Sequence, residues 1–342
     1  MFCKVLALSD RYAAENNLRF SYTFDLRPGH YHAVNFEKFV GLLKNRSIEL
    51  CNYLQQPYLP LVRAQNFTFH LTRYQKNLEG SQLDLLPGLL SQSEIFADSS
   101  SNFYDFIRRN ARQIYYISLH LGGVTEDYFF DAELTGAMRP KPEALFVAKN
   151  EAVDICLRNL ARLRQNLPSG LQDKILLETL DYEFFGGKDN SAYRYLCEPE
   201  TINFIREHAQ TGLLIDIGHV LITVCNLLGA RLEADIYAQA INYLDTVSAN
   251  NYGLIKEVHF FPTGFDAGAG LMHHYDAPLF KGLSPEYFSW EYKLALRVLR
   301  HIIAEHNRVS AEKLILNFET PVENMWQDIF LFHNTLREMD RP

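Results

Sequence analysis

Eight short runs of β-branched and aromatic residues recur along the chain, and each has the length of a strand. Most are continuous apolar runs rather than alternations of apolar and polar residues, which is typical of parallel strands buried on both faces. The runs predict strands at residues 18–26, 47–53, 67–74, 113–121, 174–182, 212–221, 255–261 and 313–320.

Longer amphipathic patterns lie between these runs, and several begin with Pro or an acidic residue, as helix N-termini often do. They predict helices at 35–45, 142–167, 199–210, 235–247 and 285–307. Eight strands alternating with helices predict an α/β fold in which the strands close into a (β/α)₈ TIM barrel.

The chain has 342 residues, whereas this fold usually takes about 250, so we expect loop insertions. The largest is the Ser/Leu-rich segment 76–112 between the third and fourth strands, which we predict to be a lid or irregular loop with a short helix. No internal repeat and no low-complexity linker interrupts the alternation. The pattern therefore favours one domain over residues 1–342, and a two-domain division with a boundary near 140–145 is the alternative.

Composition narrows the class of protein. Lys and Arg number 33 against 41 Asp and Glu, a formal net charge of −8, which argues against broad binding to a nucleic-acid backbone. No run reaches the roughly 18 apolar residues of a membrane-spanning helix, and the N-terminal segment turns polar too soon for a signal peptide. The five cysteines are widely spaced without a C-x-x-C pair, which predicts reduced thiols and no thiolate-built zinc site. We expect a cytoplasmic protein without a membrane partner.

His and acidic residues gather at the C-terminal ends of the predicted strands, where the chemistry of this fold lies. The candidates for metal ligands are His70, His120, Glu178, Asp216, His219, His259, His274, Asp276 and Glu319. Any one alone could be a structural residue. Six strands that each bring a carboxylate or an imidazole to one rim would be costly without a cation.

These residues therefore predict a metal site. Nitrogen and oxygen donors without sulfur suit iron, with manganese or zinc as alternatives. Nine candidate ligands exceed what one ion can bind, which indicates two or three ions. The chain has no G-x-S-x-G, P-loop or G-x-G-x-x-G motif to support a serine hydrolase, P-loop nucleotide or dinucleotide site.

The spacing of these residues resembles that of the xylose-isomerase-like TIM barrel superfamily. The shared pattern is His at strands three and four, Glu at five, Asp-x-x-His at six, His at seven and Glu at eight. Within the superfamily, residues 197–229 and the Glu-x-His of 255–261 resemble the multinuclear non-haem iron-dependent oxidative enzymes. That family carries Asp-x-His where this chain has His274-x-Asp276, in the reverse order.

The resemblance implies an enzyme with two or three iron ions that modifies a peptide or small-molecule substrate with O₂, with a partner protein presenting the peptide in some relatives. Glu178 and Glu319 are the carboxylates we expect to be catalytic. Three alternatives stay open. One is a divalent-metal sugar isomerase or epimerase in which Glu178 and Glu319 move a proton. The second is an endonuclease IV-like phosphodiesterase with three zinc ions, against which the charge of −8 counts. The third is a non-catalytic barrel with a structural metal.

Overall fold

A computed structural model gives the structure of the chain. It describes residues 2–25, 48–51, 66–71, 102–122, 124–125, 128–131, 137–141, 143–182, 193–260, 263–266, 270–274, 289–318 and 325–340.

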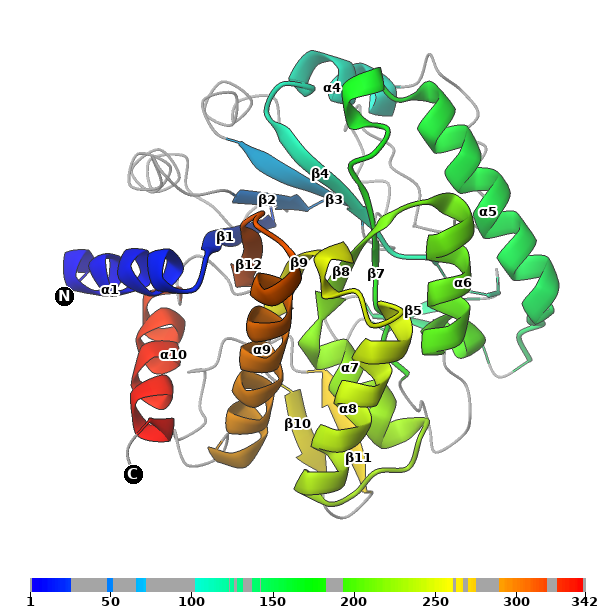
Figure 1. The fold of residues 1–342 in the computed structure, drawn as a ribbon. Coiled ribbons are helices and arrows are strands. Elements are labelled where there is room, and N and C mark those ends of the chain that lie inside the picture. The colour runs from blue at the N-terminus through cyan, green and yellow to red at the C-terminus, as the bar shows by residue number, and fades with distance from the viewer. Residues whose placement is uncertain are drawn as a thin grey trace. The chain divides into compact units, whose positions relative to one another are not determined.

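Eight parallel strands form the sheet, in the order β1-β12-β9-β8-β7-β4-β3-β2 of a closed barrel. The strands are β1 (Leu18–Asp25), β2 (Ile48–Cys51), β3 (Phe67–Leu71), β4 (Ile114–Leu119), β7 (Ile175–Glu178), β8 (Gly212–Asp216), β9 (Ile255–Phe260) and β12 (Leu314–Phe318). Each lies within one of the runs predicted from the sequence. The prediction of an α/β (β/α)₈ TIM barrel is confirmed (Figure 1).

Two predicted boundaries are wrong. Residues 217–221 were expected to continue a strand, but helix α7 (Ile217–Asn226) begins directly after Asp216, whose side chain caps it. All ten residues of α7 are buried, so its sequence lacks the exposed polar face that marks an amphipathic helix. The helix predicted from residue 142 begins only at Lys149, and the Val147 N–H instead donates to the carbonyl of Val124.

The chain divides into two compact units, and the single-domain prediction stays a prediction. Unit 1 comprises residues 1–23, 181–183 and 214–342. In it β12 pairs in parallel with β1 and β9, and a hairpin joins β10 (Thr263–Asp266) to β11 (Leu271–His274). Its helices are α1 (Phe2–Glu15), α7, α8 (Glu233–Val247), η5 (Tyr252–Leu254), α9 (Ser289–Val309) and α10 (Met325–Met339).

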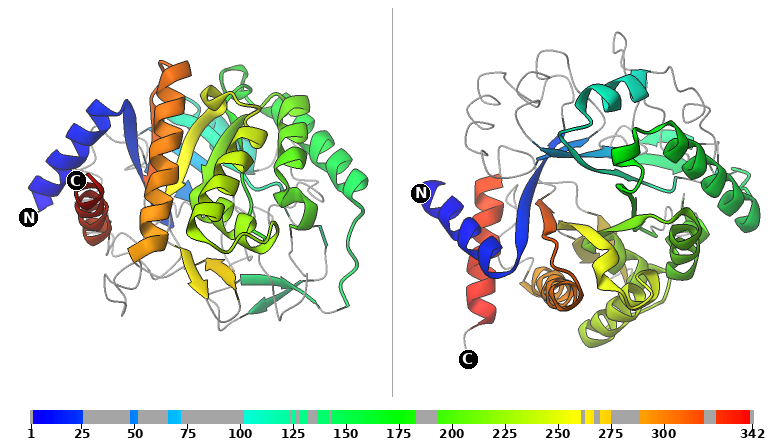
Figure 2. Two further views of the ribbon diagram at one scale, coloured as in Figure 1. Left: turned by 60° about the horizontal axis from the view of Figure 1, so that its bottom comes forward. Right: turned by 45° about the horizontal axis from the view of Figure 1, so that its top comes forward.

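Unit 2 comprises residues 24–180 and 184–213, in which β3 pairs in parallel with β2 and β4, and β4 with β7. It also holds a hairpin of β5 (Tyr128–Asp131) and β6 (Ala137–Pro140). Its helices are α4 (Asn102–Asn110), α5 (Lys149–Asn166), η3 (Ser169–Leu171), η4 (Arg194–Cys197) and α6 (Pro199–Ala209). Helices α5 and α6 lie side by side (Figure 2).

The predicted insertion 76–112 is described only from residue 102, where α4 begins, and residues 76–101 lie outside the described residues. The helix predicted at 35–45 also lies outside them. Within the described part of the chain, no helix is long and apolar enough to cross a membrane.

The two terminal helices of unit 1, α1 and α10, lie side by side (Figure 1), and an aromatic core joins them to the strands. Phe332 of α10 is fully buried, and its ring lies 5.3 Å from that of Phe318 in β12 and 5.6 Å from that of Phe260 in β9. It also meets the ring of Tyr12 in α1 edge-on at 5.5 Å. Burial of this ring is therefore a main source of the stability of α10 on the barrel strands.

His333, the next residue of α10, is 7% exposed, and its Nε2 lies 3.0 Å from the Oγ of the buried Ser9 in α1. Burial, with a smaller contribution from Arg337, lowers the pKa of His333 from 6.5 to about 4. Between these two values the unfolded chain binds the proton more tightly, so the free energy of unfolding falls as the pH drops through this range. We expect a loss of about 2 kcal/mol from this residue between pH 7 and pH 4.

Urea unfolding of wild type and His333→Gln at several pH values measures this loss, because the glutamine does not titrate. The difference in unfolding free energy between the two proteins should shrink or reverse on going from pH 7 to pH 4. His208→Gln, at an exposed position on α6, should keep the wild-type pH dependence. A His333→Gln profile parallel to wild type would contradict the prediction.

Candidate metal centre

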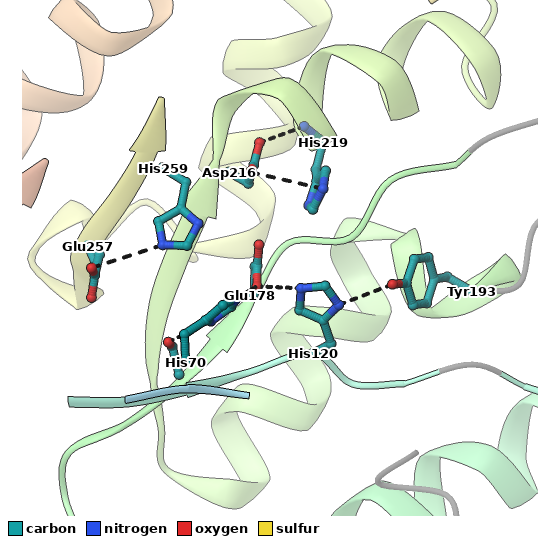
Figure 3. A network of polar contacts seen from close by, with 9 residues as sticks. His70, His120, Glu178, Tyr193, Asp216, His219, Glu257 and His259 are labelled. Atoms are coloured by element: carbon teal, nitrogen blue, oxygen red, sulfur yellow. Dashed lines mark hydrogen bonds and ion pairs between the residues drawn. The ribbon is translucent and has the colours of Figure 1, made fainter. Parts of the chain in front are cut away.

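Three predicted ligands come together in unit 2, each at the C-terminal end of its strand. We call His70, His120 and Glu178 the first cluster. His70 lies in β3, His120 directly follows β4, and Glu178 ends β7. All three are buried, Glu178 with 1% of its surface exposed. The Oε2 atom of Glu178 lies 2.7 Å from Nε2 of His120 and 3.4 Å from Nε2 of His70 (Figure 3). Both imidazoles thus present the same nitrogen to one carboxylate oxygen.

Two hydroxyl groups contact the Nδ1 atoms of the His70 and His120 rings. The Oγ of Ser118 in β4 lies 2.8 Å from Nδ1 of His70. The Oη of Tyr193 lies 3.1 Å from Nδ1 of His120 (Figure 3). Ser118 is fully buried and Tyr193 is 2% exposed. Partners of this kind fix the orientation of metal-ligating histidines and leave Nε2 as the ligand atom.

Asp216 and His219 form a pair at the start of α7 in unit 1. Asp216 ends β8 and is the N-cap of the helix, where its Oδ1 accepts the N–H of His219 at 2.9 Å. An aspartate cap of this kind stabilises a helix start. Its other oxygen, Oδ2, lies 4.0 Å from Nε2 of His219. The cap therefore explains the Asp-x-x-His spacing, because it places both side chains at one end of the helix.

Glu257 and His259 lie on the neighbouring strand β9, and both are fully buried. Residues two apart on a strand point to the same face, and Oε1 of Glu257 lies 4.0 Å from Nε2 of His259 (Figure 3). In the strand register, the buried Asn317 of β12 lies opposite His259, and the buried Ser21 of β1 lies opposite Asn317. We call Asp216, His219, Glu257 and His259 the second cluster.

The separations within the first cluster suit a shared ion. Two ligand atoms that each lie about 2.1 Å from one ion, at an angle of 90° to 110°, are roughly 3.0–3.4 Å apart. The Nε2–Oε2 distances of 2.7 and 3.4 Å bracket this range. Asp216 and His219, at 4.0 Å, are within twice the metal–ligand distance. The donors are imidazole nitrogen and carboxylate oxygen, which suit iron, manganese or zinc.

Three predicted ligands cannot be placed in either cluster. His274 lies on β11, and nothing is described of its side chain. Asp276 and Glu319 lie outside the described residues. The sequence interpretation in turn missed Ser118, Tyr193 and Glu257 as parts of the site. The Glu-x-His alternation within an apolar strand was the signal for Glu257, whereas no local signal marked Tyr193.

Three cysteines of the described part of the chain, Cys156, Cys197 and Cys225, are buried. Burial raises the pKa of Cys156 and of Cys225 to about 12, so both stay protonated at neutral pH.

No family model matches the chain, and no curated protein matches it. Similar solved structures include a xylose isomerase domain containing protein from Salmonella typhimurium LT2, 13% identical, with 95% of this chain and 98% of that chain covered and a TM-score of 0.48. SacUVDE is 11% identical, with 95% and 100% covered and a TM-score of 0.43. A D-psicose 3-epimerase is 11% identical, with 92% and 90% covered and a TM-score of 0.42. Likenesses this distant carry no argument about this chain's activity, and the fold assignment rests on its own strand order.

Proposed function

We propose that the chain is a metal-dependent enzyme, a non-haem iron oxidative enzyme with two or three iron ions that uses O₂ to modify a peptide or small-molecule substrate. The observation that carries the proposal is the convergence of His70 and His120 on Glu178. A sugar isomerase or epimerase that binds one divalent ion through carboxylates and one histidine does not need the imidazoles of His70 and His120. A centre with several ions would use both imidazoles as ligands.

The two clusters supply ligands for more than one ion. In unit 2, His70, His120 and Glu178 would hold one ion. In unit 1, Asp216, His219 and His259 would hold another, and His274, Asp276 and Glu319 would complete the ligand set. The buried carboxylates favour this arrangement, because a cation offsets the cost of keeping their charge away from water.

A bound redox metal supplies open positions for substrate and O₂ and lowers the pKa of a coordinated substrate group. The chain's own residues orient the ligand side chains and exclude bulk water. Ser118 and Tyr193 hold the two imidazole rings so that Nε2 faces Glu178, and burial of Glu178 keeps bulk water away from it. Glu178 and Glu319 are the carboxylates that we propose to be catalytic, as ligands of the ions.

The substrate and its delivery follow from the same proposal. A peptide or small molecule is the substrate, a partner protein would present a peptide, and nucleic acid is disfavoured by the net charge of −8. We place the activity in the cytoplasm, in keeping with the reduced thiols that five widely spaced cysteines predict.

Metal analysis of protein purified without oxygen tests the proposal. We expect two or more irons per chain by inductively coupled plasma mass spectrometry, and Mössbauer spectra of an iron-57 sample that show iron bound by the protein. One manganese per chain would overturn it in favour of a sugar isomerase or epimerase. Zinc without iron would overturn it in favour of a phosphodiesterase.

Asp216→Asn separates a catalytic metal from a structural one. Asparagine caps a helix about as well as aspartate, so α7 should form normally. It lacks the negative charge, and we expect about a hundredfold weaker iron binding, equivalent to about 3 kcal/mol. Iron content and the circular dichroism melting curve should be measured together. Full iron content in Asp216→Asn would contradict the ligand assignment, and unfolding of the variant would indicate a structural metal.

A further inference from the structure

The hydroxyl of Tyr193 lies 3.1 Å from Nδ1 of His120 (Figure 3), and a turn of the main chain at the next residue places it there. Arg194 begins η4 with a φ of +42°, in the left-handed region that side chains other than glycine rarely adopt. Such a conformation is unfavourable and persists only where the surrounding structure imposes it. The position of the Tyr193 ring therefore depends on what holds Arg194.

An aromatic ring holds the side chain of Arg194. The Cζ atom of Arg194 lies 3.4 Å from the centroid of the Phe146 ring, well within the distance of a cation–π contact. Both side chains are half-buried, which strengthens this attraction relative to an exposed pair. Arginine suits the contact because its planar guanidinium stacks on aromatic faces. The contact with Phe146 thus compensates for the unfavourable φ of Arg194.

The segment that carries this ring is anchored to the chain that leaves the end of β4. The N–H of Val147 donates to the carbonyl of Val124 at 2.8 Å, and the Tyr195 hydroxyl donates to the carbonyl of Val147. Val124 is fully buried and lies four residues after His120. A closed chain of contacts therefore leaves His120 along the main chain and returns to it through the Tyr193 hydroxyl, all of it within unit 2.

The hydrogen bond between Tyr193 and His120 depends on this arrangement, because hydrogen bonds weaken steeply when their distance or angle changes. Without the Phe146 ring, the φ of Arg194 would relax toward negative values and turn the chain differently after Tyr193. The hydroxyl would then move away from Nδ1 of His120, although no predicted metal ligand has been changed.

We propose that Arg194 and Phe146 are positioning residues whose contact holds the Tyr193 hydroxyl at Nδ1 of His120, and so sets the direction in which Nε2 of His120 points. This inference rests on the proposed function, in which His120 binds a metal ion. It assigns an effect on metal affinity to two residues that lie outside both clusters and that are not themselves ligands.

Co²⁺ titration of the metal-free protein tests the proposal, because the visible bands of bound Co²⁺ report coordination geometry. In Tyr193→Phe we expect one Co²⁺-binding step to weaken by about 10- to 100-fold, as when a partner of a metal-ligating histidine is lost. Phe146→Leu and Arg194→Ala should each weaken the same step by about tenfold, with the same spectral change. Combined with Tyr193→Phe, neither should add a further loss, because both act through Tyr193.

Three further variants separate positioning from stability. Arg194→Gly should bind Co²⁺ more tightly than Arg194→Ala, because glycine adopts a positive φ without a contact that imposes it. Phe146→Tyr keeps the aromatic face and should bind Co²⁺ as the wild type does. Lys149→Gln is the matched control, since it removes an ion pair with Glu198 between the same two segments. Both side chains of that pair are partly exposed, so the Co²⁺ affinity and spectrum should stay as in wild type.

Phe146→Leu and Arg194→Ala should fold, because both side chains are only half-buried. If these variants are less stable yet bind Co²⁺ with wild-type affinity and spectrum, the positioning role is overturned. Wild-type affinity in Tyr193→Phe would overturn it as well, and so would an Arg194→Gly protein that binds Co²⁺ no better than Arg194→Ala. Failure of the wild-type protein to bind Co²⁺ would instead refute the proposed function, and the positioning role with it.

Discussion

Replacing Glu178 with glutamine is expected to weaken iron binding by about a thousandfold, equivalent to about 4 kcal/mol. The Oε2 of Glu178 is the atom on which both Nε2 atoms of the first cluster converge. A neutral amide of the same size removes the charge that offsets a cation and turns one oxygen ligand into an NH₂ group that cannot ligate.

Anaerobic competition titration with a chromophoric chelator measures the iron affinity, and oxygen uptake in the presence of reductant measures turnover. Both should fall together in Glu178→Gln, while the metal-free protein should keep its fold because the side-chain volume is unchanged. Glu198→Gln is a matched control, since Glu198 is a half-buried carboxylate that pairs with Lys149 on the surface of the same unit. Wild-type iron content and affinity in Glu178→Gln would refute the assignment of Glu178 as a ligand.

Truncation of Phe332 to alanine should lower the free energy of unfolding by about 4 kcal/mol. The ring is fully buried, and it contacts aromatic rings of α1, β9 and β12, so its removal leaves a cavity where three elements of unit 1 meet. The loss combines the transfer energy of the ring with the cost of the cavity. Urea unfolding at pH 7 measures it, away from the titration of His333.

Phe330 supplies the control on the same helix. Its side chain is 44% exposed, so Phe330→Ala should change the free energy of unfolding by about 0.5 kcal/mol or less. Equal losses in the two variants would show that α10 is not held on the strands through Phe332. The comparison excludes helix propensity as the cause, because both substitutions replace the same residue type in one helix.

The strands could be predicted from the sequence because a strand buried on both faces leaves a continuous apolar run between polar segments. The same signal misled at residues 217–221, where a fully buried helix leaves an identical run. Only the structure shows that Asp216 ends the strand, since its side chain bonds the N–H of His219 and starts the helix. The local pattern of apolar residues thus locates a buried segment, but it does not always decide whether that segment is a strand or a helix.

The candidate ligands were predictable for a related reason. His70, His120 and Glu178 interrupt apolar strands with groups that are costly to bury, so each stands out along the chain. Their number and type also predict the class of metal. What the sequence by itself determined is therefore the eight-strand alternation, the barrel it implies and the inventory of buried polar residues near strand ends.

The partners of those ligands were decided only by the tertiary structure. Ser118 lies 48 residues from His70, and Tyr193 lies 73 from His120. A hydroxyl at such a distance along the chain leaves no periodic signal, because its role depends on which strands and helices become neighbours on folding. Long-range packing selects these contacts, and so the ligands could be inferred from the sequence while the groups that orient them could not.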